Sequence, residues 1–283
     1  MTINFTMFAQ NNKDDYVRQA YVAAMSIRCS NKDVSICLIT NDSVDIQYKH
    51  MFDYIIPMQN VNYNDKGEWK IHNRWQIYNC TPYDQTVVID TDMLVLDDIS
   101  SWWNYLQTKE LFFVSNVKTY KNENVIDNYY RKAFKKYDLP NIYSGFHYFK
   151  KSEFSYTFYK WLEYVLKNWK VFYNEFAGGT VYQKQASVDL SCAIVCKILG
   201  VESKILGIGI DYPTFTHMKT YIQGWSTPNS NSWQRIVGTY FTKDCELKIG
   251  NFQQHGIFHY TEKDFLTDEI VNTYKSFFEE LNA

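Results

Sequence analysis

The sequence predicts an α/β fold, because short apolar runs alternate with longer amphipathic stretches through residues 1–100. The runs expected to form strands are residues 3–9, 35–40, 54–58 and 87–89, and the expected helices are residues 14–29 and 71–79. Alternation at this spacing indicates right-handed β-α-β units and a parallel sheet. Ligands bind beyond the carboxyl ends of the strands in such sheets, so residues that follow a strand are the first candidates for a site.

The second part of the chain is less regular but continues the same kind of pattern. The expected strands are residues 111–115 and 142–149, the expected helices are residues 124–136, 152–169 and 188–199, and residues 223–233 form the clearest loop. Ser144-Gly145 interrupts one apolar strand, where a glycine often marks the close approach of a ligand or of another backbone. No repeat and no low-complexity linker divides the 283 residues, so we expect a single domain.

The amino-acid composition narrows the cellular compartment and the binding partners that we expect. The net charge is −2, so no overall field attracts nucleic acid, although basic residues are in excess at 118–136, where we expect a solvated helix face. The six cysteines form no Cys-x-x-Cys pair, which argues against a zinc or redox site and suits a reducing compartment. Neither a signal peptide nor an apolar run of membrane length is present. We therefore expect a cytoplasmic protein without an integral membrane segment.

The most informative segment is Thr86–Asp98, in which two acids follow a buried strand. The apolar run Val87–Ile89 ends at Asp90 and Asp92, and a second apolar run begins immediately after them. Carboxylates at the end of a buried strand are costly unless a cation binds them. A turn in which Asp bonds its own backbone is the simple alternative, but the apolar residues on both sides favour a divalent ion held by carboxylate and phosphate oxygens.

Residues 82–98 resemble the Asp-x-Asp region of GT-A glycosyltransferases and are most similar to the glycogenin and lipopolysaccharide galactosyltransferase family. The resemblance implies a GT-A type Rossmann-like mixed sheet flanked by helices, in a single domain spanning residues 1–283. Residues 1–100 would bind the nucleotide-sugar and residues 101–283 the acceptor. In that family the two acids bind Mn²⁺ or Mg²⁺, which holds the diphosphate of a sugar nucleotide, usually a UDP-sugar, and neutralises it as it leaves.

The same resemblance assigns residues to the metal and the diphosphate. Asp90 and Asp92 would hold the ion together with His259, which is preferred over the nearby His255, and Asp90 is also a candidate to accept a ribose hydroxyl. Two basic residues would offset charge on the diphosphate and help its departure, and these are Arg74 and Lys263.

Further positions are implied for the base and for the sugar. Ser144 and Gly145 match the strand beneath the donor sugar, and Asp189 matches the family's acid near the reacting carbon. The residues expected beside the base are Phe8, Ala9, Gln10 and Tyr16.

Three positions depart from the family pattern. Tyr143 stands where the family has Asn, Leu190 stands where it has Gln, and Lys263 follows His259 by only four positions without the intervening Gly. Both missing amide side chains belong to the sugar pocket. If the family's outcome holds, the reaction retains the anomeric configuration and the leaving phosphate helps to deprotonate the acceptor; otherwise Asp189 is the first candidate for a general base in an inverting displacement.

The interpretation is therefore a metal-dependent glycosyltransferase whose acceptor is open. A glycan, a lipid-linked sugar, a protein hydroxyl and a hydroxymethylated base of DNA all remain candidates, and the DNA acceptor would need a basic groove and an extruded base. One rival class is a nucleotidyltransferase, which would show a glycine-rich loop after the first strand, whereas residues 9–15 contain no glycine. Another is a non-catalytic carbohydrate- or nucleotide-binding protein on the same fold.

Overall fold

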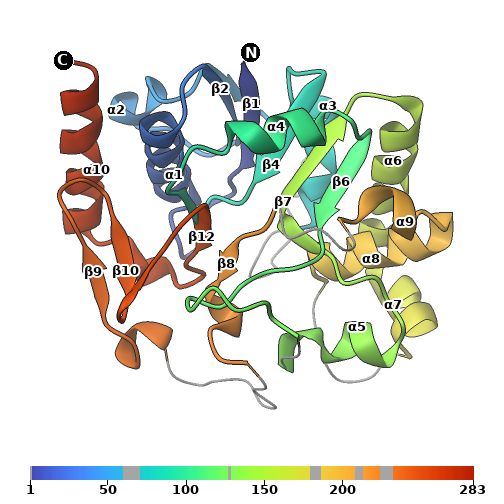
Figure 1. Ribbon diagram of the computed structural model, residues 1–283. Coiled ribbons are helices and arrows are strands. Elements are labelled where there is room, and N and C mark those ends of the chain that lie inside the picture. The colour runs from blue at the N-terminus through green and yellow to red at the C-terminus, as the bar shows by residue number, and fades with distance from the viewer. Residues whose placement is uncertain (1, 60–70, 127–128, 179–185, 208–212, 224–231) are drawn as a thin grey trace.

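A six-stranded mixed sheet forms the centre of the molecule in the computed structural model, which describes residues 2–59, 71–126, 129–178, 186–207, 213–223 and 232–283. The strand order is β3-β2-β1-β4-β7-β6 (Figure 1). The strands are β1 (Ile3–Phe8), β2 (Val34–Ile39), β3 (Tyr54–Ile56), β4 (Gln85–Ile89), β6 (Leu111–Val114) and β7 (Tyr143–Lys150). The first four run parallel and β7 is antiparallel to both of its neighbours, so the predicted mixed sheet is confirmed.

Helices cover both faces of this sheet. Side chains on successive strand residues point to opposite faces, so each strand contributes to two cores. Phe5 and Met7 of β1 belong to one hydrophobic core, and Phe8 belongs to the other. The first core lies beneath α1 (Tyr16–Ser30) and α10 (Asp268–Leu281), and the second beneath α6 (Glu153–Lys167) and α8 (Val188–Leu199). Near-continuous apolar strands are the expected consequence of burial on both sides.

A small three-stranded sheet joins the distant parts of the chain that matter for the site. Its order is β5-β12-β8, with bounds β5 (Met93–Val95), β12 (Ile257–His259) and β8 (Thr216–His217). β12 runs antiparallel to β5 and parallel to β8. The register sets His259 opposite Met93 and beside His217, so it brings β12 next to the segment that directly follows Asp92.

The remaining elements are short. A second small sheet contains β9 (Thr239–Phe241), β10 (Leu247–Ile249) and β11 (Phe252–Gln253). The other α-helices are α2 (Ile46–Lys49), α3 (Ile77–Cys80), α4 (Ser100–Leu106), α5 (Lys132–Lys136), α7 (Trp169–Ala177) and α9 (Glu202–Ile205). The 3₁₀ helices are η1 (Ile71–Gln76), η2 (Tyr129–Arg131), η3 (Met218–Thr220), η4 (Trp233–Arg235) and η5 (Lys263–Phe265).

Three helix predictions needed correction. The predicted helix 71–79 is largely 3₁₀ helix, and helix 152–169 ends at Asn168, whose non-helical φ of −117° separates α6 from α7. Within the described residues, helix 124–136 begins only at Tyr129. Most of the predicted loop 223–233 lies outside the described residues. No helix in the described part of the chain is long and apolar enough to cross a membrane.

Candidate functional site

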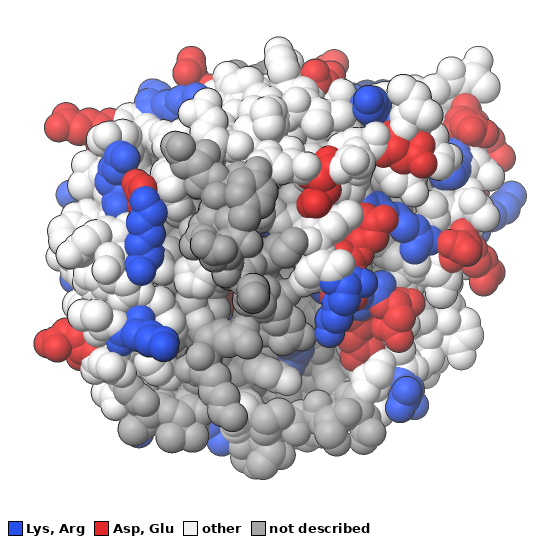
Figure 2. Space-filling view, turned by 180° about the vertical axis from the view of Figure 1, so that it is seen from behind, with Lys and Arg blue, Asp and Glu red and all other residues white. Residues whose placement is uncertain are grey.

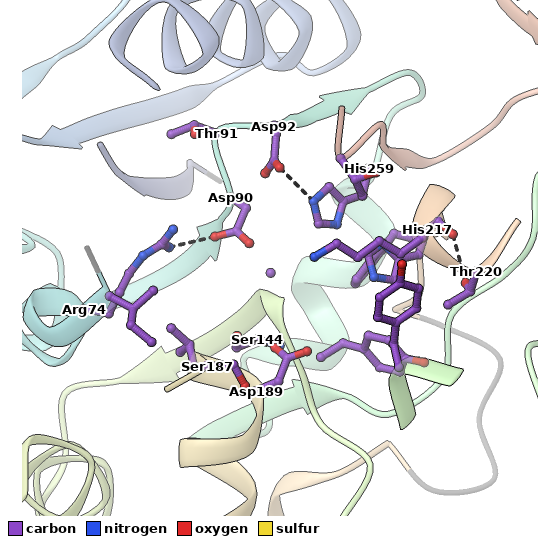
Figure 3. Close-up of a pocket in the computed structure, with 18 of the residues that line it drawn as sticks. Arg74, Asp90, Thr91, Asp92, Ser144, Ser187, Asp189, His217, Thr220 and His259 are labelled. Atoms are coloured by element: carbon purple, nitrogen blue, oxygen red, sulfur yellow. Dashed lines mark hydrogen bonds and ion pairs between the residues drawn. The ribbon is translucent and has the colours of Figure 1, made fainter. Parts of the chain in front are cut away.

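A cleft of about 740 Å³ opens where the parallel strands of the central sheet end. Its walls come from segments far apart in the sequence, including the ends of β1 and β4, the start of β7, the first turn of α8, and the ends of β8 and β12. Figure 3 shows Asp90 and Asp92 on one side of this space and Ser144 and Asp189 on the other. The two sides of the cleft thus carry separate polar clusters, one around Asp90 and Asp92 and the other around Asp189.

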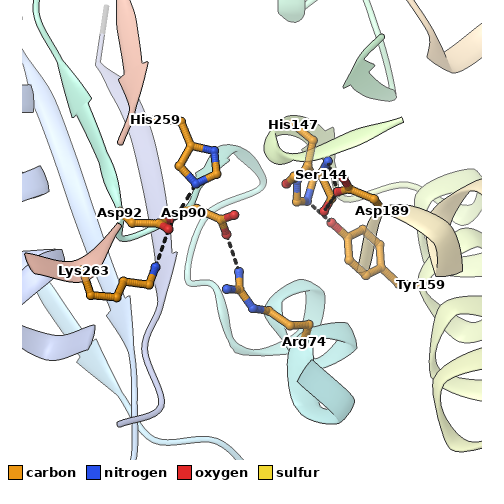
Figure 4. A network of polar contacts seen from close by, with 9 residues as sticks. All are labelled: Arg74, Asp90, Asp92, Ser144, His147, Tyr159, Asp189, His259 and Lys263. Carbon is orange, nitrogen blue, oxygen red and sulfur yellow. Dashed lines mark hydrogen bonds and ion pairs between the residues drawn. The ribbon is translucent and has the colours of Figure 1, made fainter. Parts of the chain in front are cut away.

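The first group contains Asp90, Asp92 and His259. One ligand atom from each lies within 4.8 Å of the others, which meets the spacing needed to hold one metal ion. His259 Nε2 lies 3.1 Å from Asp92 Oδ2, and its side chain is only 11% exposed (Figure 4). By contrast, the alternative ligand His255 is exposed and pairs with Asp97 at 3.3 Å, away from the cleft.

Two basic side chains compensate these carboxylates. Arg74 Nη1 lies 2.7 Å from Asp90 Oδ1, and Lys263 Nζ pairs with Asp92 Oδ2. Burial disfavours the ionised form of Asp92, but the charges of His259 and Lys263 and the hydrogen bonds from them outweigh it and hold the pKa of that carboxyl well below its usual value. Although burial opposes it, the same carboxylate raises the pKa of Lys263. Asp92 and Lys263 therefore form an ionised pair at neutral pH.

The lack of a side chain at Gly145 leaves space for the carboxylate of Asp90. A Cβ at this position would lie 3.0 Å from Asp90 Oδ2 and 2.7 Å from Met93 Cε, and Asp90 N donates to Gly145 O at 2.8 Å. The glycine in this strand therefore marks a close approach, which here is that of the Asp90 segment. Two carboxylates and one imidazole match the ligand preferences of Mn²⁺, and the carboxylate oxygens suit Mg²⁺, so the residues present fit a divalent ion.

The second group has Asp189 at its centre. Asp189 lies in the first turn of α8, and Ser187, just before this helix, caps it by accepting a hydrogen bond from Leu190 N at 3.2 Å. Its Oδ1 accepts hydrogen bonds from Ser144 N at 2.8 Å and from Ser144 Oγ at 2.6 Å, and its Oδ2 accepts from Arg131 Nη2 at 2.7 Å. Burial raises the pKa of Asp189, but Arg131 and the Ser144 hydrogen bonds outweigh it and lower that pKa overall.

Arg131 is a site residue that we expected on a solvated helix face, and this expectation was wrong. Its guanidinium lies 3.5 Å from the ring centroid of Tyr143 and 4.6 Å from that of Phe134, and Nη1 donates to Ile142 O at 2.8 Å. Tyr143, which stands in place of the family's Asn, therefore packs flat against a cation within the cleft wall. No local pattern in the sequence indicated this pairing.

Sequence reasoning also missed a part of the wall formed by β8 and η3. His217 lies in the cleft lining, with its ring stacked on that of His259. The signal was weak, because β8 is only two residues long and its pairing with β12 is long-range. Other cleft-lining residues that were not anticipated are Lys13, Asp14, Ile71, Thr91, Tyr129, Tyr130, Ser187, Val188, Phe215, Lys219, Thr220 and Thr261.

The residues expected beside the base lie on the side of the cleft near the end of β1. Phe8, Gln10 and Tyr16 line it, and Lys263 Nζ lies 5.0 Å from the ring centroid of Tyr16. Ala9 is fully buried and does not line the cleft; its backbone N donates to Ile39 O at 3.0 Å within the sheet region.

Comparison with known proteins finds a similar fold among solved structures. No protein-family model and no curated protein sequence matches the chain. The solved structure of the galactosyltransferase LgtC, in complex with donor and acceptor sugar analogs, aligns with a TM-score of 0.50 at 10% identity over 97% of this chain and 96% of that chain. The chain therefore has the GT-A fold, and the predicted fold class is confirmed. At this level of identity the likeness concerns the fold alone.

Two other structures align over a smaller part of the chain. The glycosyltransferase GlyE of Streptococcus pneumoniae TIGR4 aligns with a TM-score of 0.43 at 14% identity, over 73% of this chain and 45% of GlyE. Mouse xyloside xylosyltransferase 1 aligns with a TM-score of 0.44 at 10% identity, over 74% of this chain and 85% of that chain. The present chain thus matches less than half of the length of GlyE.

Proposed function

We propose that this protein is a metal-dependent glycosyltransferase that moves a sugar from a nucleotide-sugar, specifically a UDP-sugar, to a hydroxyl acceptor. The observation that carries the proposal is a group of three side chains inside the cleft of a GT-A fold: Asp90 and Asp92, which follow β4, and His259 at the end of β12. Acids at the ends of parallel strands stand where α/β sheets bind their ligands. The LgtC structure, which carries donor and acceptor sugar analogs, supports the same class of substrate.

In this proposal the two aspartates and His259 hold Mn²⁺ or Mg²⁺. When bound, the ion would neutralise charge on the leaving diphosphate. Arg74 and Lys263 already lie against these carboxylates, so they stand ready to interact with the diphosphate once the aspartates hold the ion. Phe8, Gln10 and Tyr16 would border the base, whereas Ala9 is buried behind the cleft wall and would not touch it.

We assign Asp189 the role of a positioning residue for the sugar rather than that of a general base. Both of its oxygens accept hydrogen bonds, and its lowered pKa disfavours uptake of a proton. A general base must reach the acceptor hydroxyl and take its proton near the working pH. Asp189 instead fixes Ser144, which would lie beneath the sugar. This favours the retaining reaction, in which the leaving phosphate helps to deprotonate the acceptor.

The two halves of the chain would then contribute unequally to the site. Residues 1–100 provide the base-binding residues and the two aspartates, and residues 101–283 form the acceptor side. His259 and Lys263 belong to the second half but pair with Asp92 in the first, so binding of the donor would engage both.

Charge gives little support to the alternative of a DNA acceptor. Arg131, one of the basic residues at 118–136, is paired with Asp189 inside the cleft. On the face shown in Figure 2, basic and acidic side chains are interspersed, and no continuous basic stripe crosses its described part. Binding of a duplex would require such a stripe along the phosphates. We therefore favour the hydroxyl of a glycan, a lipid-linked sugar or a protein.

The test is the thermal stability of the protein with UDP, GDP, CMP or dTDP, each with and without Mn²⁺. A ligand that binds only the folded state stabilises it by mass action, by about 2.7 kcal/mol at a hundredfold excess over Kd, and so raises the melting temperature. We expect a shift with UDP that requires Mn²⁺ and disappears in Asp92→Ala. Asp98→Asn is the matched control. Asp98 is an exposed acid of the same segment whose Oδ1 accepts a hydrogen bond from Ser100 N at 2.8 Å, so its substitution should leave the shift intact. Absence of a shift with every nucleotide would contradict the proposal.

A further inference from the structure

Two imidazole rings lie face to face in the wall of the cleft, those of His217 and His259. Parallel pairing of β8 with β12 places the residues side by side, and their ring centroids are 4.6 Å apart with planes inclined by 15° (Figure 3). The residues are 7% and 9% exposed. His217 does not belong to the group of described residues whose donor atoms converge within 4.8 Å, so it is not itself a candidate ligand of the ion.

His259 lacks the partner that normally orients a metal-binding imidazole. Such a histidine ordinarily donates its other ring N–H to a carboxylate, a carbonyl or a water molecule. Nδ1 of His259 is buried and has no hydrogen-bond partner among the described residues. Its Nε2 faces Asp92, so the polar contact on that side cannot fix the ring plane by itself. Packing against the faces of the ring must therefore provide the orientation.

His217 is firmly held and is able to provide that packing. Its backbone N donates to Lys118 O and its carbonyl accepts from Thr220 Oγ1, both at 2.9 Å. The edges of two aromatic rings support it, with centroid distances of 5.7 Å to both Tyr143 and Phe215.

We propose that His217 is a positioning residue that holds the imidazole of His259, by face-to-face stacking, in the orientation needed to bind the metal ion. This inference rests on the proposed function, because the ligand role of His259 is part of it. The same inference gives a structural role to Tyr143. The tyrosine ring supports His217 with its edge and carries the Arg131 guanidinium on its face, so packing connects His259 to the Asp189 group.

The experiment is a Mn²⁺ titration of the full chain followed by the electron paramagnetic resonance signal of free Mn²⁺, without nucleotide or sugar. His217→Leu removes the flat ring but retains much of its volume, and His217→Phe retains a flat ring but removes both nitrogens. We expect Mn²⁺ to bind His217→Leu roughly 10-fold or more weakly and His217→Phe within about threefold of the wild type. His255→Leu is the control, because His255 is 70% exposed on its side chain and should not affect binding.

Each outcome has a distinct meaning, provided that circular dichroism shows the variants to be folded. Equal binding by the wild type and His217→Leu would overturn this inference and leave the metal site standing. Equal loss in His217→Leu and His217→Phe would also overturn it, because a ring nitrogen and not the stack would then matter. If the wild type binds no Mn²⁺, the proposed metal site fails and the inference fails with it.

Discussion

The two carboxylate groups of the cleft resemble each other in burial and charge but differ in what holds them. Asp92 pairs with the side chains of His259 and Lys263 (Figure 4). Asp189 instead accepts hydrogen bonds from the backbone N of Ser144 and from Arg131. Lysine is a flexible cation that moves at small cost, while a backbone N–H in a strand is fixed. Under the proposed function the first group would therefore exchange a protein cation for a metal ion, whereas the second would keep its arrangement.

This difference explains why two acids with lowered pKa values should have separate roles. A low pKa keeps both ionised, and only the surroundings decide whether an oxygen is available to a ligand. Substitutions in the two groups should consequently affect different quantities. Metal affinity should depend on the group around Asp92, and folding stability should depend on the group around Asp189.

The largest effect is expected from Asp92→Asn. Loss of this charge removes a metal ligand, so we expect sugar transfer to fall on the order of 1000-fold, equivalent to ~4 kcal/mol of activation free energy. Initial rates and the Mn²⁺ titration provide the measurement. Full Mn²⁺ affinity in this variant would mean that the ion binds elsewhere and that the contrast between the groups is misplaced.

Asp189→Asn should affect stability instead. The change leaves Arg131 without its buried partner, and breaking such a pair costs about 3 kcal/mol, since the side chains are 11% and 30% exposed. Chemical denaturation measures this loss, and the Mn²⁺ titration should give the wild-type affinity. A double variant with Arg131→Met is the control, because removal of both charges should recover part of the stability. A loss of Mn²⁺ affinity as large as that of Asp92→Asn would contradict the division of roles.

His147, which contacts Ser144 of the second group, makes the folding stability of the protein depend on pH. Its Nδ1 donates to Ser144 O and its Nε2 accepts from Tyr159 Oη, both at 2.8 Å, and burial lowers its pKa to about 4. Between pH 6.5 and 4 the unfolded state binds a proton that the folded state does not, so stability falls as the pH falls. The contribution is about 3 kcal/mol, from about 2.5 pKa units at 1.36 kcal/mol each.

Replacing His147 with Gln should flatten the stability profile by this amount. Denaturant unfolding at pH 7 and at pH 4 is the measurement. The lowered pKa values of Asp92 and Asp189 act below this window, because stability that depends on a depressed carboxyl pKa is lost only as the pH falls through the folded value. An unchanged slope in His147→Gln would show that His147 is not held neutral.

The smallest effect is expected from Gly145→Ala. The new Cβ would press on Met93 Cε, which is flexible, and on Asp90 Oδ2, which is held by Arg74. Overpacking of this kind costs about 1–2 kcal/mol and should also weaken Mn²⁺ binding by displacing Asp90. Gly238→Ala is the matched control, because its Cβ would meet no atom closer than 3.5 Å. Equal effects of the two substitutions would remove the special role of Gly145.

The sequence predicted most of the central sheet but not the whole of the cleft. Asp90 and Asp92 were identified because a local pattern, an apolar run ending in spaced acids, marks the carboxyl end of a strand. Arg131 and His217 were missed because their positions depend on long-range packing, Arg131 on Tyr143 and Asp189, and His217 on the pairing of β8 with β12. The break at Asn168 was missed for a related reason, since apolar spacing continues from α6 into α7.

The most direct test of the central claim is release of the nucleotide from a panel of UDP-sugars, with and without an added hydroxyl acceptor. We predict release that requires Mn²⁺ or Mg²⁺, that is abolished by Asp92→Asn and that persists in Asp98→Asn. A protein that binds UDP in the presence of Mn²⁺ yet releases none from any UDP-sugar would contradict the account, and would identify the chain as a non-catalytic binding protein on the same fold.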